Sequence, residues 1–161
     1  MPRNDNKGIK KEFANEVFIS EIIKLLDEGY TVTLRLKGFS MRPFLEDNRD
    51  KALLTRPGRP AVGDPVLAEI APKHFVLHRI VKIEGENVTL RGDGNLNNEY
   101  CTIKDIKASV IGFYRKERTT LDPISGMKWK IYSWIWTKLY PVRRYLLAFY
   151  RRIWLKMFNP I

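Results

Sequence analysis

Cysteine and histidine are scarce in this chain, which contains one Cys and two His among 161 residues. The lone Cys101 cannot form an internal disulfide bond, and so few thiol and imidazole groups exclude a structural zinc site of the Cys/His type. Glycine and proline together make up about an eighth of the chain, too little for a collagen-like or low-complexity sequence. The hydrophobic content of 44% predicts one domain of ordinary size with a packed core. We expect neither a metal nor a cofactor.

Long hydrophobic runs are also absent. The longest segments without Lys, Arg, Asp or Glu have seven residues, as in residues 131–137, whereas a membrane-spanning helix needs about 20 mostly apolar residues. Residues 1–13 are polar and charged and contain no apolar segment typical of a secretory signal. The sequence therefore predicts neither an export signal nor a spanning helix.

Acidic residues are nearly missing from the last part of the chain. Residues 1–113 carry a net charge of +2, whereas residues 114–161 carry +9 and contain only two acids, Glu117 and Asp122. All four tryptophans also lie in this last part. The excess positive charge and the indole rings therefore belong to a C-terminal tail whose composition differs from that of the rest of the chain.

Hydrophobic periodicity predicts a mainly β protein with helices at both ends. Apolar residues spaced by three and four over residues 13–26 predict an amphipathic helix that ends near Gly29. Alternation of apolar and polar residues over 30–37 predicts a strand that ends near Gly38. Further strands are expected at 50–55, 65–70, 74–83, 87–91 and 108–116, separated by turn-forming residues.

Three segments follow from these patterns. Residues 1–29 form an N-terminal tail and amphipathic helix, residues 30–118 form a β domain, and residues 119–161 form a basic, aromatic, helical tail. Two helical stretches of the tail meet at Pro141, which is expected to open the second helix because a proline is tolerated at the first helical position.

Three groups are candidates for nucleophilic catalysis. Ser40 follows a strand in a turn that can present its hydroxyl outward, and a serine needs a neighbouring base to become a nucleophile. His78 lies in the middle of a strand among apolar residues, and its ordinary pKa of about 6.5 suits a general base. Asp93 and Glu99 lie in a turn-rich stretch, and either carboxylate would orient the imidazole of a Ser-His-acid triad. Each of these residues, taken alone, also has an ordinary structural explanation. A serine or a carboxylate is common in a turn, and a histidine can be part of a hydrophobic core.

Taken in order, four short segments resemble the boxes of the S24/S26 serine peptidases, a superfamily that includes signal peptidase I and LexA-type repressors. They are residues 38–43 (GFSMRP), 63–64 (GD), 77–80 (LHRI) and 92–95 (GDGN). The resemblance covers residues 30–115 and implies a β-barrel domain of the LexA/signal-peptidase type, flanked here by the N-terminal and C-terminal amphipathic helices.

The resemblance also implies roles for the candidate residues. Most bacterial members use a lysine as the general base, but this chain carries His78 at that position, as in the endoplasmic-reticulum and archaeal signal peptidases. Ser40 would then be the nucleophile, His78 the general base and Asp93 the leading candidate for the acid, with Glu99 as its close rival. The Ser40 backbone N–H would be an oxyanion donor. Many bacterial members carry a hydroxyl two residues before the serine, where this chain has Gly38.

The chain departs from both parent architectures before the serine box. Signal peptidases usually carry a spanning helix there, whereas the helix expected at residues 13–26 is amphipathic and would cap the barrel. The first 30 residues are too short for the DNA-binding domain of a LexA-type repressor.

The expected activity is that of a serine endopeptidase that cleaves a peptide or protein substrate through an acyl-enzyme. The alternative is a non-catalytic module of the same fold that binds a peptide or stabilises a membrane complex.

The tail suggests a membrane surface as a second partner. The second tail helix repeats apolar residues at positions 142, 146, 149, 153 and 157, with most of its arginines off that stripe. Aromatic and basic residues favour the headgroup region of an anionic membrane, so residues 126–158 are expected to attach the chain at an interface. The alternatives are packing of the stripe on the β domain or on a second copy in a homo-oligomer; nucleic acid suits this composition less well. Without an export signal, the expected location is the cytoplasmic face of a membrane.

Overall fold

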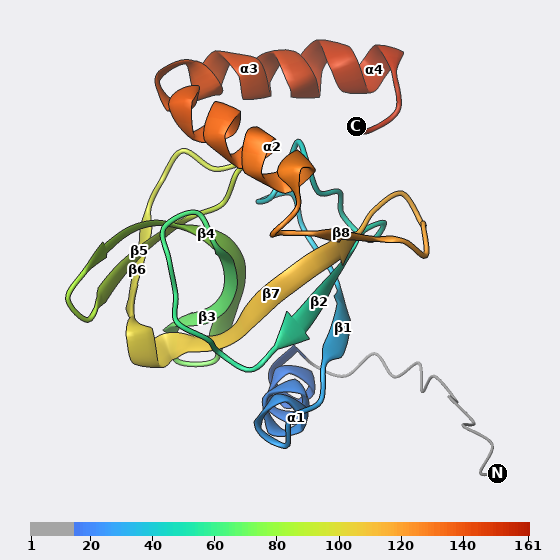
Figure 1. Cartoon of the computed structure of the whole chain (residues 1–161). Helices are drawn as coiled ribbons and strands as arrows, with labels where there is room; N and C mark the ends of the chain where they lie inside the picture. Colours follow the sequence, from blue (N-terminus) through green and yellow to red (C-terminus); the bar gives the residue numbers. More distant parts are fainter. Residues whose placement is uncertain (1–14) are drawn as a thin grey trace, which may run out of the picture.

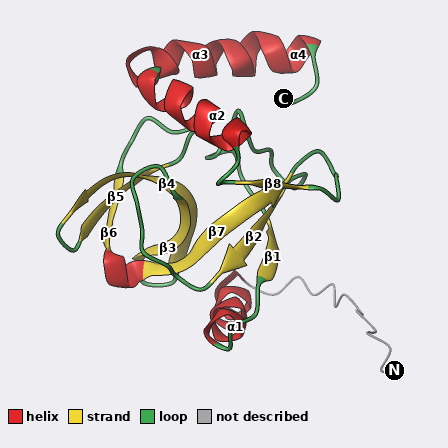
Figure 2. Ribbon diagram, in the orientation of Figure 1, coloured by secondary structure: helices red, strands yellow, loops and turns green. Residues whose placement is uncertain are grey.

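The computed structural model describes residues 15–161, and its main element is an antiparallel β-sheet (Figure 1, Figure 2). The N-terminal tail and the first residues of the helix expected at 13–26 lie outside the described residues. The described chain also contains helices before and after the sheet. This confirms the expectation of a mainly β fold with helices at both ends.

The sheet has eight strands within the described residues, and its strand order is β1-β2-β7-β3-β4-β5-β6. β8 pairs with β7 outside this path, and every pairing is antiparallel. The path runs from β1 at one edge to β6 at the other. The strands are β1 (Val32–Arg35), β2 (Lys51–Thr55), β3 (Pro65–Ala71), β4 (His74–Glu84), β5 (Asn87–Arg91), β6 (Glu99–Thr102), β7 (Ile106–Tyr114) and β8 (Leu121–Pro123).

Six of these strands agree closely with the strands predicted from alternation of apolar and polar residues. The two that sequence reasoning missed, β6 and β8, are four and three residues long. β6 exposes Tyr100 and forms the edge of the sheet, so its sequence lacks the apolar alternation that marks a half-buried strand. β8 has only three residues and ends at Pro123, which cannot donate a ladder hydrogen bond, so its sequence carries no strand pattern.

Helix α1 (Asn15–Asp27) packs under the sheet near β1 and β7. Its inward residues Ile19, Ile22 and Leu26 are buried, as the spacing of three and four predicts. Gly29 then ends the helix with a positive φ of 94°, a conformation that glycine adopts without steric penalty.

Helix α2 (Met127–Lys138) begins the C-terminal tail and packs on the sheet domain. The Tyr132 ring stacks on Phe44 with centroids 4.4 Å apart, and the Trp129 ring meets Phe44 edge to face with centroids 5.2 Å apart. Trp129 lies in the same buried cluster as α1 residues and strand residues. Residues of all three expected segments therefore share one hydrophobic core.

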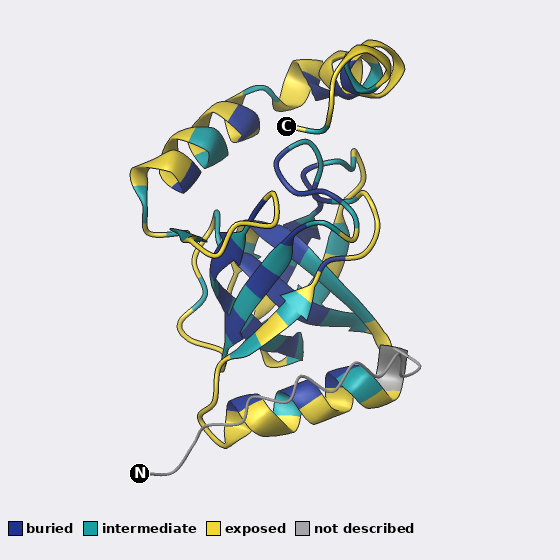
Figure 3. Ribbon diagram, turned by 90° about the vertical axis from the view of Figure 1, so that its right-hand side faces the viewer, coloured by how far each residue is buried: buried dark blue, intermediate teal, exposed yellow. Residues whose placement is uncertain are grey.

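The chain then turns through η2 (Tyr140–Val142), with Pro141 at its start as expected. Three consecutive helical segments follow: α3 (Arg143–Phe149), the π-helical η3 (Tyr150–Trp154) and α4 (Leu155–Met157). Leu147 and Tyr150 are buried, and both lie beside residues of the loop that follows β1. The apolar stripe expected from the sequence lies on the outer surface instead, and its five residues are 36–68% exposed (Figure 3). The stripe therefore does not pack on the β domain. None of the described helices is both long and apolar enough to cross a membrane.

Candidate active site

Ser40 lies in a loop that follows β1 and is held in place by several contacts. The backbone N–H of Gly38 donates to Asp47 at 2.7 Å. The guanidinium of Arg42 lies 4.0 Å over the Phe39 ring and forms an ion pair with Glu46 four residues later. The residues on both sides of the serine are thus fixed by groups within the same loop.

The Ser40 loop packs directly against the loop of residues 92–95. The N–H of Gly94 donates to the Ser40 carbonyl oxygen at 2.7 Å. A β-carbon on Gly92 would lie 2.4 Å from that same carbonyl oxygen, and one on Gly94 would lie 2.5 Å from the Phe39 carbonyl oxygen. Only glycine permits this close approach of two backbones. This explains why both Gly92 and Gly94 lack a side chain.

His78 reaches the same place from β4, where it pairs with Val66 of β3. Its ring is 3% exposed, and its Nε2 atom would lie 3.0 Å from a β-carbon on Gly92. The Ser40 carbonyl oxygen and His78 Nε2 therefore both lie within contact distance of one point. The structure brings the Ser40 and His78 segments, separated along the chain by two strands, to the same side of the domain.

Glu99 is the acid in contact with His78. It is the first residue of β6, and its Oε2 atom is hydrogen-bonded to His78 Nδ1. Glu99 retains 29% side-chain exposure, whereas the histidine is almost fully enclosed. Burial lowers the pKa of His78 below its usual value, although the neighbouring Glu99 carboxylate acts in the opposite direction. A lowered pKa favours the neutral imidazole, the form that a general base needs.

Asp93 does not contact His78, which reverses the sequence-based preference between the two acids. Its carboxylate accepts two hydrogen bonds from the Arg79 guanidinium at 2.8 and 2.7 Å and a third from the Tyr132 hydroxyl at 2.8 Å. Asp93 is 1% exposed, and a buried carboxylate needs such a counter-charge because desolvation is costly. Asp93 thus fixes the glycine loop, while Glu99 takes the position next to the imidazole.

Asn95 is a site residue that sequence reasoning missed. Its Nδ2 atom would lie 2.8 Å from a β-carbon on Gly92, the same point that His78 Nε2 approaches. In the sequence, Asn95 stands directly after the Gly-Asp-Gly turn. Asparagine is common in any loop, so this position alone did not mark it as a site residue. The carboxamide brings a hydrogen-bond donor next to Ser40 and His78.

A cavity of about 250 Å³ adjoins Ser40. Its lining comes from the serine loop, from Gly94 and Asn95, and from the tail residues Leu147, Tyr150 and Arg151. Within residues 15–161, the Ser40 hydroxyl makes no hydrogen bond to His78 or to another group. Ser40 is one of the residues that line this cavity.

The described residues contain no group of three His, Cys, Asp or Glu side chains that could hold a metal ion. The comparison with protein-family models and the search of curated proteins both gave no match.

Proposed function

We propose that this protein is a serine endopeptidase of the S24/S26 type, with Ser40 as the nucleophile, His78 as the general base and Glu99 as the acid that orients the base. The observation that carries the proposal is the convergence at Gly92. There, the backbone of the serine loop and Nε2 of a buried histidine meet, and a carboxylate binds the other ring nitrogen. The curved antiparallel sheet with its N-terminal helix is compatible with the LexA/signal-peptidase-like barrel that the four sequence boxes imply.

The reaction follows from these positions. The Ser40 Oγ attacks the carbonyl carbon of the scissile peptide bond, and its proton passes to His78 Nε2. Glu99 accepts a hydrogen bond from Nδ1–H, which selects the tautomer with a free Nε2 and stabilises the imidazolium. The imidazolium then gives its proton to the leaving amine as the C–N bond breaks and the acyl-enzyme forms. A water molecule, deprotonated by the same imidazole, hydrolyses the ester and releases Ser40.

The negative charge on the tetrahedral intermediate requires hydrogen-bond donors. The Ser40 N–H is one candidate, and the Asn95 side-chain amide is a second, because it lies next to the same glycine as His78 Nε2. An amide donor from residue 95 would replace the hydroxyl that Gly38 cannot provide.

The tail supports a second part of the proposal, which is attachment to a membrane surface. Residues 126–158 carry exposed apolar side chains on both tail helices, among them Trp134, Phe149 and Met157, at 53–68% exposure. Basic residues such as Lys130 and Arg144 are exposed on the same helices. Apolar side chains beside cationic ones suit the headgroup region of an anionic membrane.

Active-site labelling tests the catalytic assignment. A fluorophosphonate probe is expected to label the wild-type protein at Ser40, and a peptide library is expected to be cleaved by the wild type but not by Ser40→Ala. Ser109→Ala is the matched control, because Ser109 lies on β7 and its hydroxyl only accepts a hydrogen bond from Gly58. Labelling and cleavage that persist unchanged in Ser40→Ala would refute Ser40 as the nucleophile.

The alternative is a non-catalytic module that binds a peptide or stabilises a membrane complex on this fold. The absence of a hydrogen bond from the Ser40 hydroxyl to His78 within the described chain is the observation in its favour. Catalytic hydrogen bonds are often loose before substrate binds, so this observation weighs less than the convergence of the three groups. Peptide binding without cleavage or labelling would support the alternative.

A further inference from the structure

The cavity beside Ser40 is built from three parts of the chain, residues 39–42, 94–95 and 147–151, of which the first and the last are about 100 residues apart in the sequence. One wall consists of Phe39, Ser40 and Arg42, with Gly94 and Asn95 beside them, and the other consists of Leu147, Tyr150 and Arg151 from α3 and η3. The second wall is part of the packed structure, because Leu147 and Tyr150 are 2% and 5% exposed. The C-terminal tail therefore shapes the space next to the candidate nucleophile.

The end of the described chain fixes this wall against the sheet domain. Arg49 donates to the backbone oxygens of Pro160 and Ile161 at 3.1 and 3.0 Å, and Arg115 donates to the Ile161 oxygen at 3.3 Å. The N–H of Ile161 in turn donates to the Tyr150 hydroxyl at 3.3 Å. These contacts keep Tyr150 and its neighbours over the serine loop.

The charge of the cavity is positive. No carboxylate is among its lining residues, which include two arginines. The charge of Arg42 is offset by its ion pair with Glu46. Arg151 donates through Nε to the Leu147 carbonyl oxygen at 3.3 Å, and its guanidinium has no acidic partner within residues 15–161. A guanidinium with two terminal nitrogens available is suited to bind a carboxylate with two oxygens.

We propose that this cavity is a substrate subsite that selects a carboxylate, with Arg151 as the specificity-determining residue. The carboxylate would bind Arg151, while the aliphatic part of the same substrate residue would lie against Leu147 and Phe39. This inference rests on the proposed peptidase function. A Glu or Asp side chain and a peptide C-terminus both provide a carboxylate, and the experiment separates the two sources.

The experiment compares cleavage of matched peptides in the absence of lipid. Each peptide of the set carries Gln at every variable position, and Glu replaces Gln at one position at a time. A further pair differs only in a free or an amidated C-terminus. For the wild type, Glu at one position, or the free C-terminus, is expected to raise kcat/KM about tenfold or more, as a charge-assisted hydrogen bond provides.

Arg151→Gln is expected to remove this preference, so that the ratio of kcat/KM for the Glu peptide to kcat/KM for the all-Gln peptide falls to about one. Arg151→Glu is expected to reverse the preference toward Lys at the same position. Arg152→Glu is the matched control, because it changes the charge by the same amount at the next residue, which is exposed and does not line the cavity. Its preference for the carboxylate is expected to be unchanged.

The outcomes separate this inference from the function on which it rests. If cleavage depends on Ser40 but the wild type shows no preference for a carboxylate, or if Arg152→Glu loses the preference as completely as Arg151→Glu, the subsite is refuted and the peptidase assignment remains. If no peptide is cleaved and the serine probe does not label the protein, both proposals fall together.

Discussion

Gly92 illustrates how the absence of one side chain determines the geometry of the whole candidate site. A β-carbon at this position would overlap the Ser40 carbonyl oxygen at 2.4 Å and would also come within 3.0 Å of His78 Nε2. Any larger residue would separate the serine loop from the histidine strand. The close approach of the Ser40 backbone and His78 Nε2 thus depends on a residue that has no functional group of its own.

The two acids near the site have distinct environments. Asp93 is enclosed and bound by Arg79 and Tyr132, whereas Glu99 is partly exposed and bound to His78. One carboxylate therefore holds the loop, and the other binds the histidine that we propose as the base. Replacing each by its isosteric amide distinguishes these roles.

We predict that Glu99→Gln lowers kcat by about 10²- to 10⁴-fold with little effect on stability, because the amide no longer stabilises the imidazolium. Asp93→Asn should instead destabilise the fold by about 3–5 kcal/mol, because it leaves the buried Arg79 charge without its partner. Peptide-cleavage kinetics and urea unfolding measure the two effects. A large loss of stability in Glu99→Gln with normal kcat per folded molecule would contradict the assignment.

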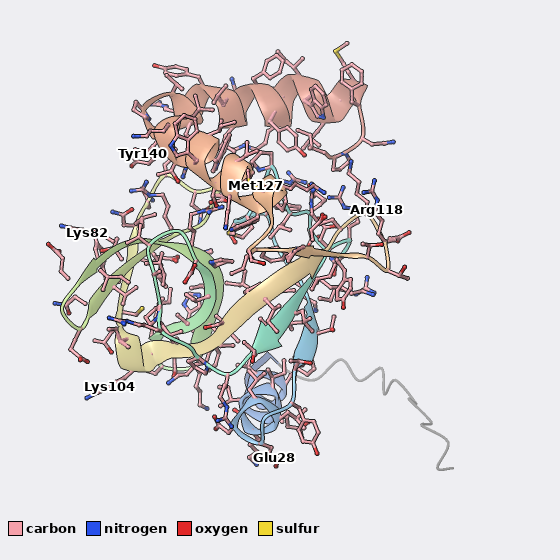
Figure 4. The ribbon with its side chains drawn as sticks, in the orientation of Figure 1. Glu28, Lys82, Lys104, Arg118, Met127 and Tyr140 are labelled. Carbon is pink, nitrogen blue, oxygen red and sulfur yellow. The ribbon has the colours of Figure 1, made fainter. Side chains whose placement is uncertain are left out.

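At the scale of secondary-structure elements, helix α2 acts on the site through Asp93. The Trp136 indole donates to the Asp93 backbone oxygen at 2.9 Å, and the Tyr132 hydroxyl binds its carboxylate. Ser133 on the same helix is hydrogen-bonded to Arg79. Figure 4 shows α2, between the labelled Met127 and Tyr140, lying over the sheet domain. The helix therefore fixes the glycine loop that contacts Ser40.

We predict that Trp136→Phe destabilises the protein by about 1–3 kcal/mol, because it leaves the buried Asp93 carbonyl oxygen without a donor. The rate of peptide cleavage should fall as well, since the 92–95 loop loses an anchor. Trp134→Phe is the matched control on the same helix, because Trp134 is 66% exposed, and its effect should stay within about 0.5 kcal/mol. Urea unfolding and kcat/KM are the measurements; equal effects of the two substitutions would disprove the anchoring role of α2.

The elements also differ in how well the sequence predicted them. β1 to β5 and β7 have the apolar alternation of strands packed on a core, so their positions were predicted to within a few residues. β6 was not, because the strand lies at the sheet edge and exposes Tyr100. This miss had a consequence for the site, since β6 is the strand that carries Glu99 to His78.

At the scale of the whole molecule, the tail has two faces with different environments. Leu147 and Tyr150 face the serine loop, while the predicted apolar stripe, which includes Phe149 and Ile153, faces outward. The periodicity of the sequence predicted this stripe, and its residues are exposed. It could not identify the inward one, because Leu147 and Tyr150 are apolar residues that only the packing distinguishes from their neighbours.

We predict that the protein binds vesicles that contain anionic phospholipid more tightly than neutral vesicles, with affinity that falls as salt is added. Phe149→Glu, at a residue 53% exposed, should weaken binding about tenfold or more without lowering thermal stability. Tyr100→Glu is the control, because Tyr100 is 69% exposed on β6 rather than in the tail. Vesicle co-sedimentation measures binding; equal binding by Phe149→Glu and wild type would contradict membrane attachment through the tail.

The sequence by itself determined the mainly β architecture, the N-terminal amphipathic helix, the turn at Pro141 and the candidate serine and histidine. These follow from local periodicity, turn chemistry and the resemblance of short ordered segments, all of which are properties of neighbours along the chain. Only the tertiary structure decided that Glu99 rather than Asp93 contacts His78, that Asn95 lies next to His78, and that tail residues line the cavity at Ser40. Those contacts join residues that are distant in sequence. They depend on burial, charge compensation and close backbone approach, and a pattern of neighbouring residues does not contain that information.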